Sequence, residues 1–158
     1  MKAVIAALGM LALAGTAQAG DHMQGVSEQL LAVSIGGKVV VTMTVHNGGT
    51  VPVYVPKALY QDKQLFGRAF ELREQGGAEI DYVGPMVKRG PYTKADYLKV
   101  LPGAKRSNSI DITRSYDFKP GAHTYQIGYS GNVVTSLARL DAPLAHATAP
   151  VTFSHSGK

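Results

Sequence analysis

The sequence predicts an all-β protein, an antiparallel immunoglobulin-like β-sandwich of about seven strands with one long ordered loop. Three observations favour this fold. Short segments rich in β-branched residues alternate between apolar and polar positions. Clusters of Gly, Pro and Asn separate these segments and are typical of turns. No segment after the first twenty residues has the period of an amphipathic helix, and many short strands between turn signals favour a sandwich.

Residues 1–19 have the composition of a cleaved secretory signal. Lys2 precedes a small and apolar run at 3–15, and Ala17-Gln18-Ala19 has the small-x-small pattern of a signal peptidase site. The run is shorter than the roughly 20 apolar residues that cross a bilayer. We therefore expect residues 20–158 to form a single β-sandwich domain, exported to the periplasm or secreted, without membrane insertion after cleavage.

Composition restricts both the source of stability and the class of partner. Cysteine is absent, so the domain must depend on a packed core rather than on disulfides. Without residues 1–19 the chain keeps 15 basic and 11 acidic residues, a net charge of +4 spread along the sequence. Nucleic-acid binders usually concentrate their charge. We expect no nucleic-acid partner.

The first two strands are expected at 26–35 and 38–47, joined by Gly36-Gly37. The second strand has one apolar face, made of Val39, Val41, Met43 and Val45. Residues 51–56, "VPVYVP", contain too much Pro for a central strand and suit a sheet edge or a crossing between sheets.

Residues 67–84 predict a hairpin with Gln75-Gly76-Gly77 at its turn, and with Ile80 and Tyr82 on the returning strand. A strand through Ile110 and Ile112 follows, and the last strand is expected within 146–155. Between them, Pro120-Gly121 opens a strand whose alternating side chains are His123, Tyr125, Ile127 and Tyr129. We interpret these aromatic residues as core, with a Tyr hydroxyl holding a neighbouring loop as in the tyrosine corner of sandwiches.

Catalytic motifs are missing from the sequence. None of the five His is followed by Glu, so there is no HExxH zinc site, and neither a G-x-S-x-G elbow nor a P-loop occurs. We expect no enzyme activity and no cofactor. A metal alternative remains, because cleavage after Ala19 would expose Gly20-Asp21-His22. Its amine, amide nitrogens and imidazole would chelate Cu(II) or Ni(II) in a square plane, whereas the competing interpretation is a plain polar terminus.

The segment Asp81 to Val100, "DYVGPMVKRGPYTKADYLKV", interrupts the strand pattern. Gly84-Pro85 and Gly90-Pro91 exclude a regular strand, while several Tyr, Leu and Val side chains can anchor a loop. Long loops in compact domains are usually functional or disordered. Structural cover and partner recognition both remain open, and the candidate partner-binding residues are Lys88, Arg89, Tyr92, Lys94, Asp96, Tyr97 and Lys99.

Short motifs also follow one another in a fixed order through this region. They are Tyr82-x-Gly84, Val87-Lys88-Arg89, Pro91-x-Thr93, Asp96-Tyr97-Leu98, Pro102-Gly103 and Asp111-Ile112-x-x-x-Tyr116-Asp117. With "TVHNGGTVPVYV" before them, they resemble the N-terminal pro-domain of bacterial aspzincin metalloendopeptidases, the deuterolysin and peptidyl-Lys metalloendopeptidase group. The resemblance extends from Val26 to Tyr129, and the HExxH of the family's zinc protease domain has no counterpart.

The resemblance implies a free-standing inhibitor, or a folding assistant acting in trans, for a lysyl-specific zinc metalloendopeptidase. Such enzymes recognise lysine with an acidic pocket, so a lysine on a rigid loop would mimic substrate. Lys88 is the first choice, with Lys94 and Lys99 as alternatives. Two other interpretations stay open, a periplasmic metal-binding protein that uses His22 and a structural sandwich module.

Overall fold

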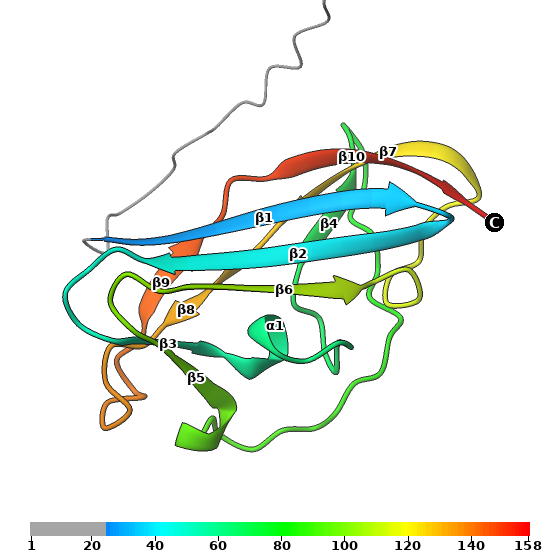
Figure 1. Ribbon diagram of the computed structural model, residues 1–158. Coiled ribbons are helices and arrows are strands. Elements are labelled where there is room, and N and C mark those ends of the chain that lie inside the picture. The colour runs from blue at the N-terminus through cyan, green and yellow to red at the C-terminus, as the bar shows by residue number, and fades with distance from the viewer. Residues whose placement is uncertain (1–24) are drawn as a thin grey trace, which may run out of the picture.

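The computed structural model describes residues 25–158, and its architecture is all-β with antiparallel sheets (Figure 1). The expected signal sequence and His22 lie outside the described residues. The elements are β1 (Val26–Ile35), β2 (Lys38–Asn47), β3 (Val53–Pro56), α1 (Lys57–Tyr60), β4 (Glu71–Glu74), the 3₁₀ helix η1 (Lys94–Asp96), β5 (Tyr97–Val100), β6 (Lys105–Asp111), β7 (Gly121–Gly128), β8 (Ser130–Val133), β9 (Leu144–Ala147) and β10 (Val151–Gly157).

Two three-stranded sheets form the body of the molecule, with strand orders β1-β2-β6 and β10-β7-β4. Two-stranded pairs, β3-β5 and β8-β9, complete the fold. The sandwich-like all-β prediction is confirmed, while the specifically immunoglobulin-like topology stays a prediction. The part of the chain that the structure describes has ten strands rather than about seven, because several of them are only four residues long and produce little alternating pattern.

The β1–β2 hairpin follows the sequence prediction residue for residue. Gly36 and Gly37 form its two-residue turn with φ of 58° and 75°, a left-handed conformation that glycine adopts without steric cost. The resulting register pairs Ile35 with Lys38 and continues to Val26 opposite Asn47. The hairpin therefore places its even-numbered β1 residues and odd-numbered β2 residues on the core side.

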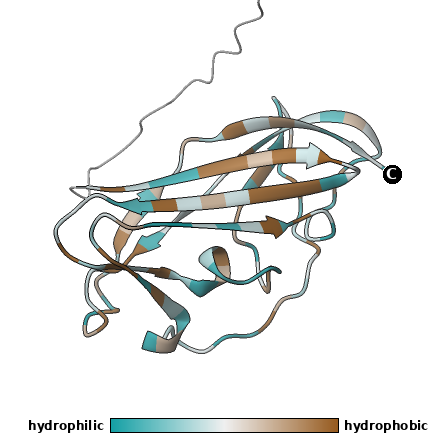
Figure 2. Ribbon diagram, viewed as in Figure 1, coloured by the Kyte–Doolittle hydropathy of each residue, from teal (hydrophilic) through white to brown (hydrophobic). Residues whose placement is uncertain are grey.

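The core lies between the two main sheets. The apolar face of β2 is fully buried, and β4, β7 and β10 supply the opposite side. Figure 2 shows hydrophobic residues alternating with polar ones along β2. The core residues of β2 are Val39, Val41, Met43 and Val45, and they share one cluster with Leu72, Tyr125, Ile127 and Phe153. The interpretation of Met43 and of Tyr125 as core residues is thus correct.

Three expected strands differ from the observed ones. The return strand of the 67–84 hairpin is reduced to one bridge between Arg73 and Glu79, because β4 pairs with β7 instead. The single strand expected within 146–155 is two strands, β9 and β10, interrupted at Pro150, which has no N–H to donate. The segment 81–100 ends in η1 and β5, so its irregular part covers only residues 83–93.

None of the helices within residues 25–158 has the length and the apolar composition needed to cross a membrane.

Tyr116 plays the role expected of a tyrosine corner. The sequence analysis predicted such a tyrosine in the strand that follows, β7. The buried Tyr116 hydroxyl accepts a hydrogen bond from Phe70 N at 3.0 Å and donates one to Phe70 O at 2.8 Å. Burial raises the pKa of Tyr116 to about 12. Tyr125 contributes a second bond of this kind, accepting from Lys119 N at 3.1 Å. The two hydroxyls hold irregular segments against the core.

We predict that Tyr116→Phe lowers the free energy of unfolding by about 2 kcal/mol, because the backbone N–H and C=O of Phe70 lose a buried partner. Urea unfolding followed by circular dichroism measures the change. Tyr92→Phe is the matched control, since the Tyr92 side chain is exposed. Equal effects of the two substitutions would contradict this role for Tyr116.

Candidate functional site

The candidate site is the irregular segment 83–93, called here the recognition loop, together with η1 and the start of β5. Its first half is fixed by Tyr82, whose ring packs edge-on against Tyr116 at 5.4 Å. The Tyr82 hydroxyl donates to Pro85 O at 2.8 Å. Gly84 permits this arrangement, because a Cβ there would lie 2.7 Å from that hydroxyl.

Backbone hydrogen bonds attach the same half of the loop to the body of the molecule. Val83 N and Gly84 N both donate to Ser115 O, at 2.9 and 3.2 Å. Val87 N donates to Phe66 O at 3.1 Å. The loop is therefore anchored up to the residue immediately before Lys88.

The second half of the loop is anchored by Asp96 in η1. The Asp96 carboxylate accepts hydrogen bonds from Thr93 N at 2.7 Å and from the Thr93 hydroxyl at 2.9 Å. Arg89 Nη1 lies 3.9 Å from Oδ1 of the same carboxylate. The bonds from Thr93, helped by the positive charge of Arg89, hold the pKa of Asp96 below its ordinary value. The carboxylate thus stays charged and holds the loop over most of the accessible pH range.

Between these anchors the loop exposes both apolar and basic side chains. Met86 is 79% exposed and Tyr92 is 58% exposed, and Val87 is exposed as well. Lys88 is exposed and has no hydrogen bond or ion pair to any residue of 25–158. Within residues 25–158, the loop therefore presents one ammonium group without a partner, and exposed apolar side chains lie on both sides of it in the sequence.

The residues predicted for the site lie in three consecutive segments of the chain. Lys88, Arg89 and Tyr92 lie on the recognition loop, Lys94 and Asp96 lie in η1, and Tyr97 and Lys99 lie on β5. Tyr92 and Tyr97 face each other with ring centroids 6.0 Å apart. Asp96 and Tyr97 are partly buried, so they support the loop more than they display a surface.

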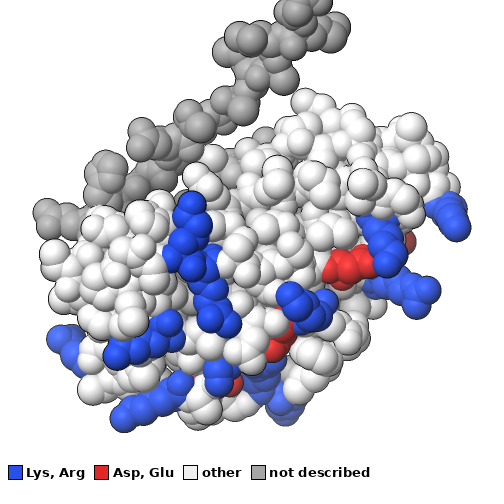
Figure 3. All heavy atoms as spheres, viewed as in Figure 1, with Lys and Arg blue, Asp and Glu red and all other residues white. Residues whose placement is uncertain are grey.

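Basic residues that are distant in sequence share the face that includes β6, α1 and β5. Figure 3 shows Lys and Arg spread over this face, with far fewer Asp and Glu. Arg106 Nε donates to Tyr60 O at 3.1 Å, which joins β6 to α1. The charges of Arg89 and Lys57 both act on Asp96.

A buried polar group that the sequence analysis did not find lies beneath the β8–β9 pair. Glu28 of β1 has a side chain that is only 1% exposed. The Tyr60 hydroxyl donates to Glu28 Oε1, and His146 Nδ1 lies 2.7 Å from Glu28 Oε2. The alternation of β1 places Glu28 on the core side of the strand, and this was the sequence signal for the buried group. Nothing in the local sequence marked its partner in β9.

Each partner of Glu28 has a shifted pKa. The Glu28 carboxylate, 2.7 Å from His146 Nδ1, raises the pKa of His146 against the opposing effect of burial. Burial, and then the charge of Glu28, raise the pKa of Tyr60, so its hydroxyl stays protonated. Burial, followed by the charge of Glu28, also raises the pKa of Tyr129. Among the three groups whose pKa Glu28 raises (His146, Tyr60 and Tyr129), His146 is therefore the one that changes charge near neutral pH.

We predict that the stability contributed by His146 is lost as pH rises above about 6.5, the ordinary pKa of His, through its raised folded-state pKa. Protonated His146 stabilises the fold fully below the unfolded-state value, and this contribution disappears when the folded-state imidazole loses its proton. Urea unfolding at a series of pH values tests this expectation. His146→Gln and Glu28→Gln should each flatten the curve in that range, and a slope unchanged in His146→Gln would contradict it.

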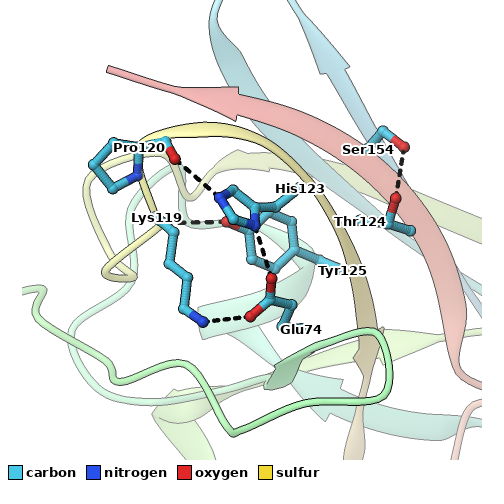
Figure 4. Close-up of polar contacts among 7 residues, drawn as sticks. All are labelled: Glu74, Lys119, Pro120, His123, Thr124, Tyr125 and Ser154. Carbon is cyan, nitrogen blue, oxygen red and sulfur yellow. Dashed lines mark hydrogen bonds and ion pairs between the residues drawn. The ribbon is translucent and has the colours of Figure 1, made fainter.

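A second polar cluster at the β4–β7 edge is shown in Figure 4. Glu74 accepts hydrogen bonds from Lys119 and from His123 Nδ1, the latter at 2.7 Å. His123 Nε2 faces Pro120 O at 2.9 Å. The Lys119 bond, followed by that of His123, lowers the pKa of Glu74. The cluster closes the turn before β7, and His123 is a surface support rather than the core residue expected.

Within residues 25–158, no group of three or more His, Asp or Glu has the arrangement of a metal site. The metal alternative at Gly20-Asp21-His22 falls on residues outside this range.

Comparison with known proteins yields little similarity. No protein-family profile matches the chain, and no curated protein matches it either. Among solved structures, the yjhA protein from Bacillus subtilis aligns with 76% of this chain and 81% of its own, at 12% identity and a TM-score of 0.34. A likeness at that level supports no conclusion about fold or function.

Proposed function

We propose that this protein is an exported binding protein that recognises a protein partner through the recognition loop, with Lys88 as the central contact. The observation that carries the proposal is an exposed lysine, without a partner among residues 25–158, in a loop fixed on both sides. Hydrogen bonds to Ser115 and Phe66 hold the loop before Lys88, and the Asp96 carboxylate holds it after Arg89.

This arrangement favours binding because the loop has little conformational freedom left to lose. Each immobilised side chain or loop segment costs free energy on association, and a preorganised surface avoids part of that cost. Met86, Val87 and Tyr92 add exposed apolar area around the charge. Aromatic and Met side chains are enriched in interface cores.

The proposed partner is a lysyl-specific zinc metalloendopeptidase of the aspzincin type. The resemblance to the family's pro-domain motivates this choice, and the exposed Lys88 ammonium has the chemistry that an acidic substrate pocket accepts. The protein would act as an inhibitor, or would assist folding of the enzyme in trans, and would not itself be an enzyme. A structural sandwich module is the competing function, and it requires no free side chain at position 88.

We predict that Lys88→Ala weakens inhibition of a lysyl-specific aspzincin at least about tenfold, the loss typical of a central interface contact. Inhibition constants of the purified proteins measure the effect. Lys158→Ala is the control, because it removes an exposed lysine at the chain end. Equal inhibition by the wild type and by Lys88→Ala would refute the role of Lys88. If the wild type neither inhibits such an enzyme nor speeds its refolding, the proposed partner is wrong.

The fixed loop has a consequence that needs no partner. Trypsin cleaves after Lys88 and Arg89 only when the segment opens enough to enter the enzyme. We predict that Asp96→Ala increases the rate of cleavage at these two residues several-fold, because Thr93 and Arg89 lose their common acceptor. Limited proteolysis followed by mass spectrometry measures the rate. Asp117→Ala, which removes an exposed carboxylate without a side-chain bond within residues 25–158, is the control. Identical cleavage of all three proteins would contradict anchoring by Asp96.

A further inference from the structure

A shallow pocket lies on the outer face of the β1-β2-β6 sheet, away from the core. Its volume is about 190 Å³, and its lining residues are Ser27, Gln29, Thr44, His46 and Lys105. They come from β1, β2 and β6, and none belongs to the recognition loop. The pocket is therefore independent of the function proposed for that loop.

Strand register explains why these side chains converge. Ser27 pairs with His46, and His46 pairs with Lys105, so the three lie in one row across the sheet. Gln29 and Thr44 form the next row. Side chains of residues paired directly across antiparallel strands lie on the same face, about 5 Å apart. The pocket is thus built on rigid backbone rather than on a loop.

The lining groups combine positive charge with hydrogen-bond donors. Lys105 has three N–H donors and makes no ion pair with any residue of 25–158, and the His46 imidazole makes no hydrogen bond among the same residues. The Thr44 hydroxyl is oriented by Ser107, 2.7 Å away. Hydroxyl and amide groups of Ser27 and Gln29 complete the ring.

Among residues 25–158, no carboxylate lines the pocket, and the nearest ones along its strands are turned away or already paired. Glu28 follows Ser27 in sequence, but its side chain points into the core toward Tyr60. Asp111 lies on the outer face at the other end of β6, where it pairs with Lys38 at 3.6 Å. The charge of Lys105 is therefore not neutralised within the sheet.

From this geometry we propose that the pocket binds a small oxyanion, a carboxylate or a phosphate group. Ammonium and oriented hydroxyl donors are the groups that bind such oxygens through charge-assisted hydrogen bonds. The volume is below the roughly 300–1,000 Å³ of sites for drug-sized ligands, so the ligand is no larger than a sugar acid. Binding is weak and reversible, because the pocket is shallow and open to solvent.

Two-dimensional amide NMR of the uniformly ¹⁵N-labelled protein tests the proposal at constant ionic strength. The probes are inorganic phosphate, sodium glucuronate and neutral glucose. We expect saturable shifts at Thr44, His46 and Lys105 with phosphate, with glucuronate or with both, and none with glucose. The responding probe identifies whether the oxyanion is a phosphate or a carboxylate.

A pair of matched variants separates a built site from general attraction of anions. Lys105→Gln should weaken binding about fivefold, the factor for losing an exposed ion pair. Lys38→Gln removes a lysine from the same outer face, at the opposite end of the sheet, and should leave affinity unchanged. No saturable shift, an equal response to glucose, or equal weakening by both variants would overturn the proposal.

Discussion

Burial of one face of β2 is the constraint on which the rest of the structure depends. β2 is the central strand of its sheet and is hydrogen-bonded to both β1 and β6. Its side chains Val39, Val41, Met43 and Val45 are completely buried. A shift of one residue in register would place Thr42, Thr44 and His46 in the core, where their polar groups would lack partners. Register, sheet orientation and the outer-face pocket all follow from this one alternation.

The end of β2 also organises the side of the molecule that carries the candidate site. Asn47 is fully buried, and its side-chain amide donates to Val51 O at 2.8 Å and to Val100 O at 3.0 Å. These bonds join the segment before β3 to the end of β5, the strand that follows η1. The recognition loop is thus connected through η1 and β5 to the buried end of β2.

A continuous set of contacts leads from the core to the other side of that loop. Tyr116 binds the backbone of Phe70 and packs against Tyr82, and Tyr82 in turn binds Pro85. The side chains of Tyr116 and Tyr82 therefore fix the position of an exposed segment relative to the core. Binding residues commonly occur on loops held by a rigid scaffold in this way. The same principle gives the β8–β9 pair its attachment, through the buried contact of His146 with Glu28.

The sequence by itself determined the fold class, the β1–β2 hairpin and the core face of β2, because period-two alternation and a Gly-Gly turn are local signals. It also located the segment that carries Lys88. Only the tertiary structure decided that β4 pairs with β7, that Glu28 meets His146, and that Lys105 joins the row of Ser27 and His46. These are contacts between residues far apart in the chain, and the pairing of distant strands that creates them leaves no local pattern in the sequence.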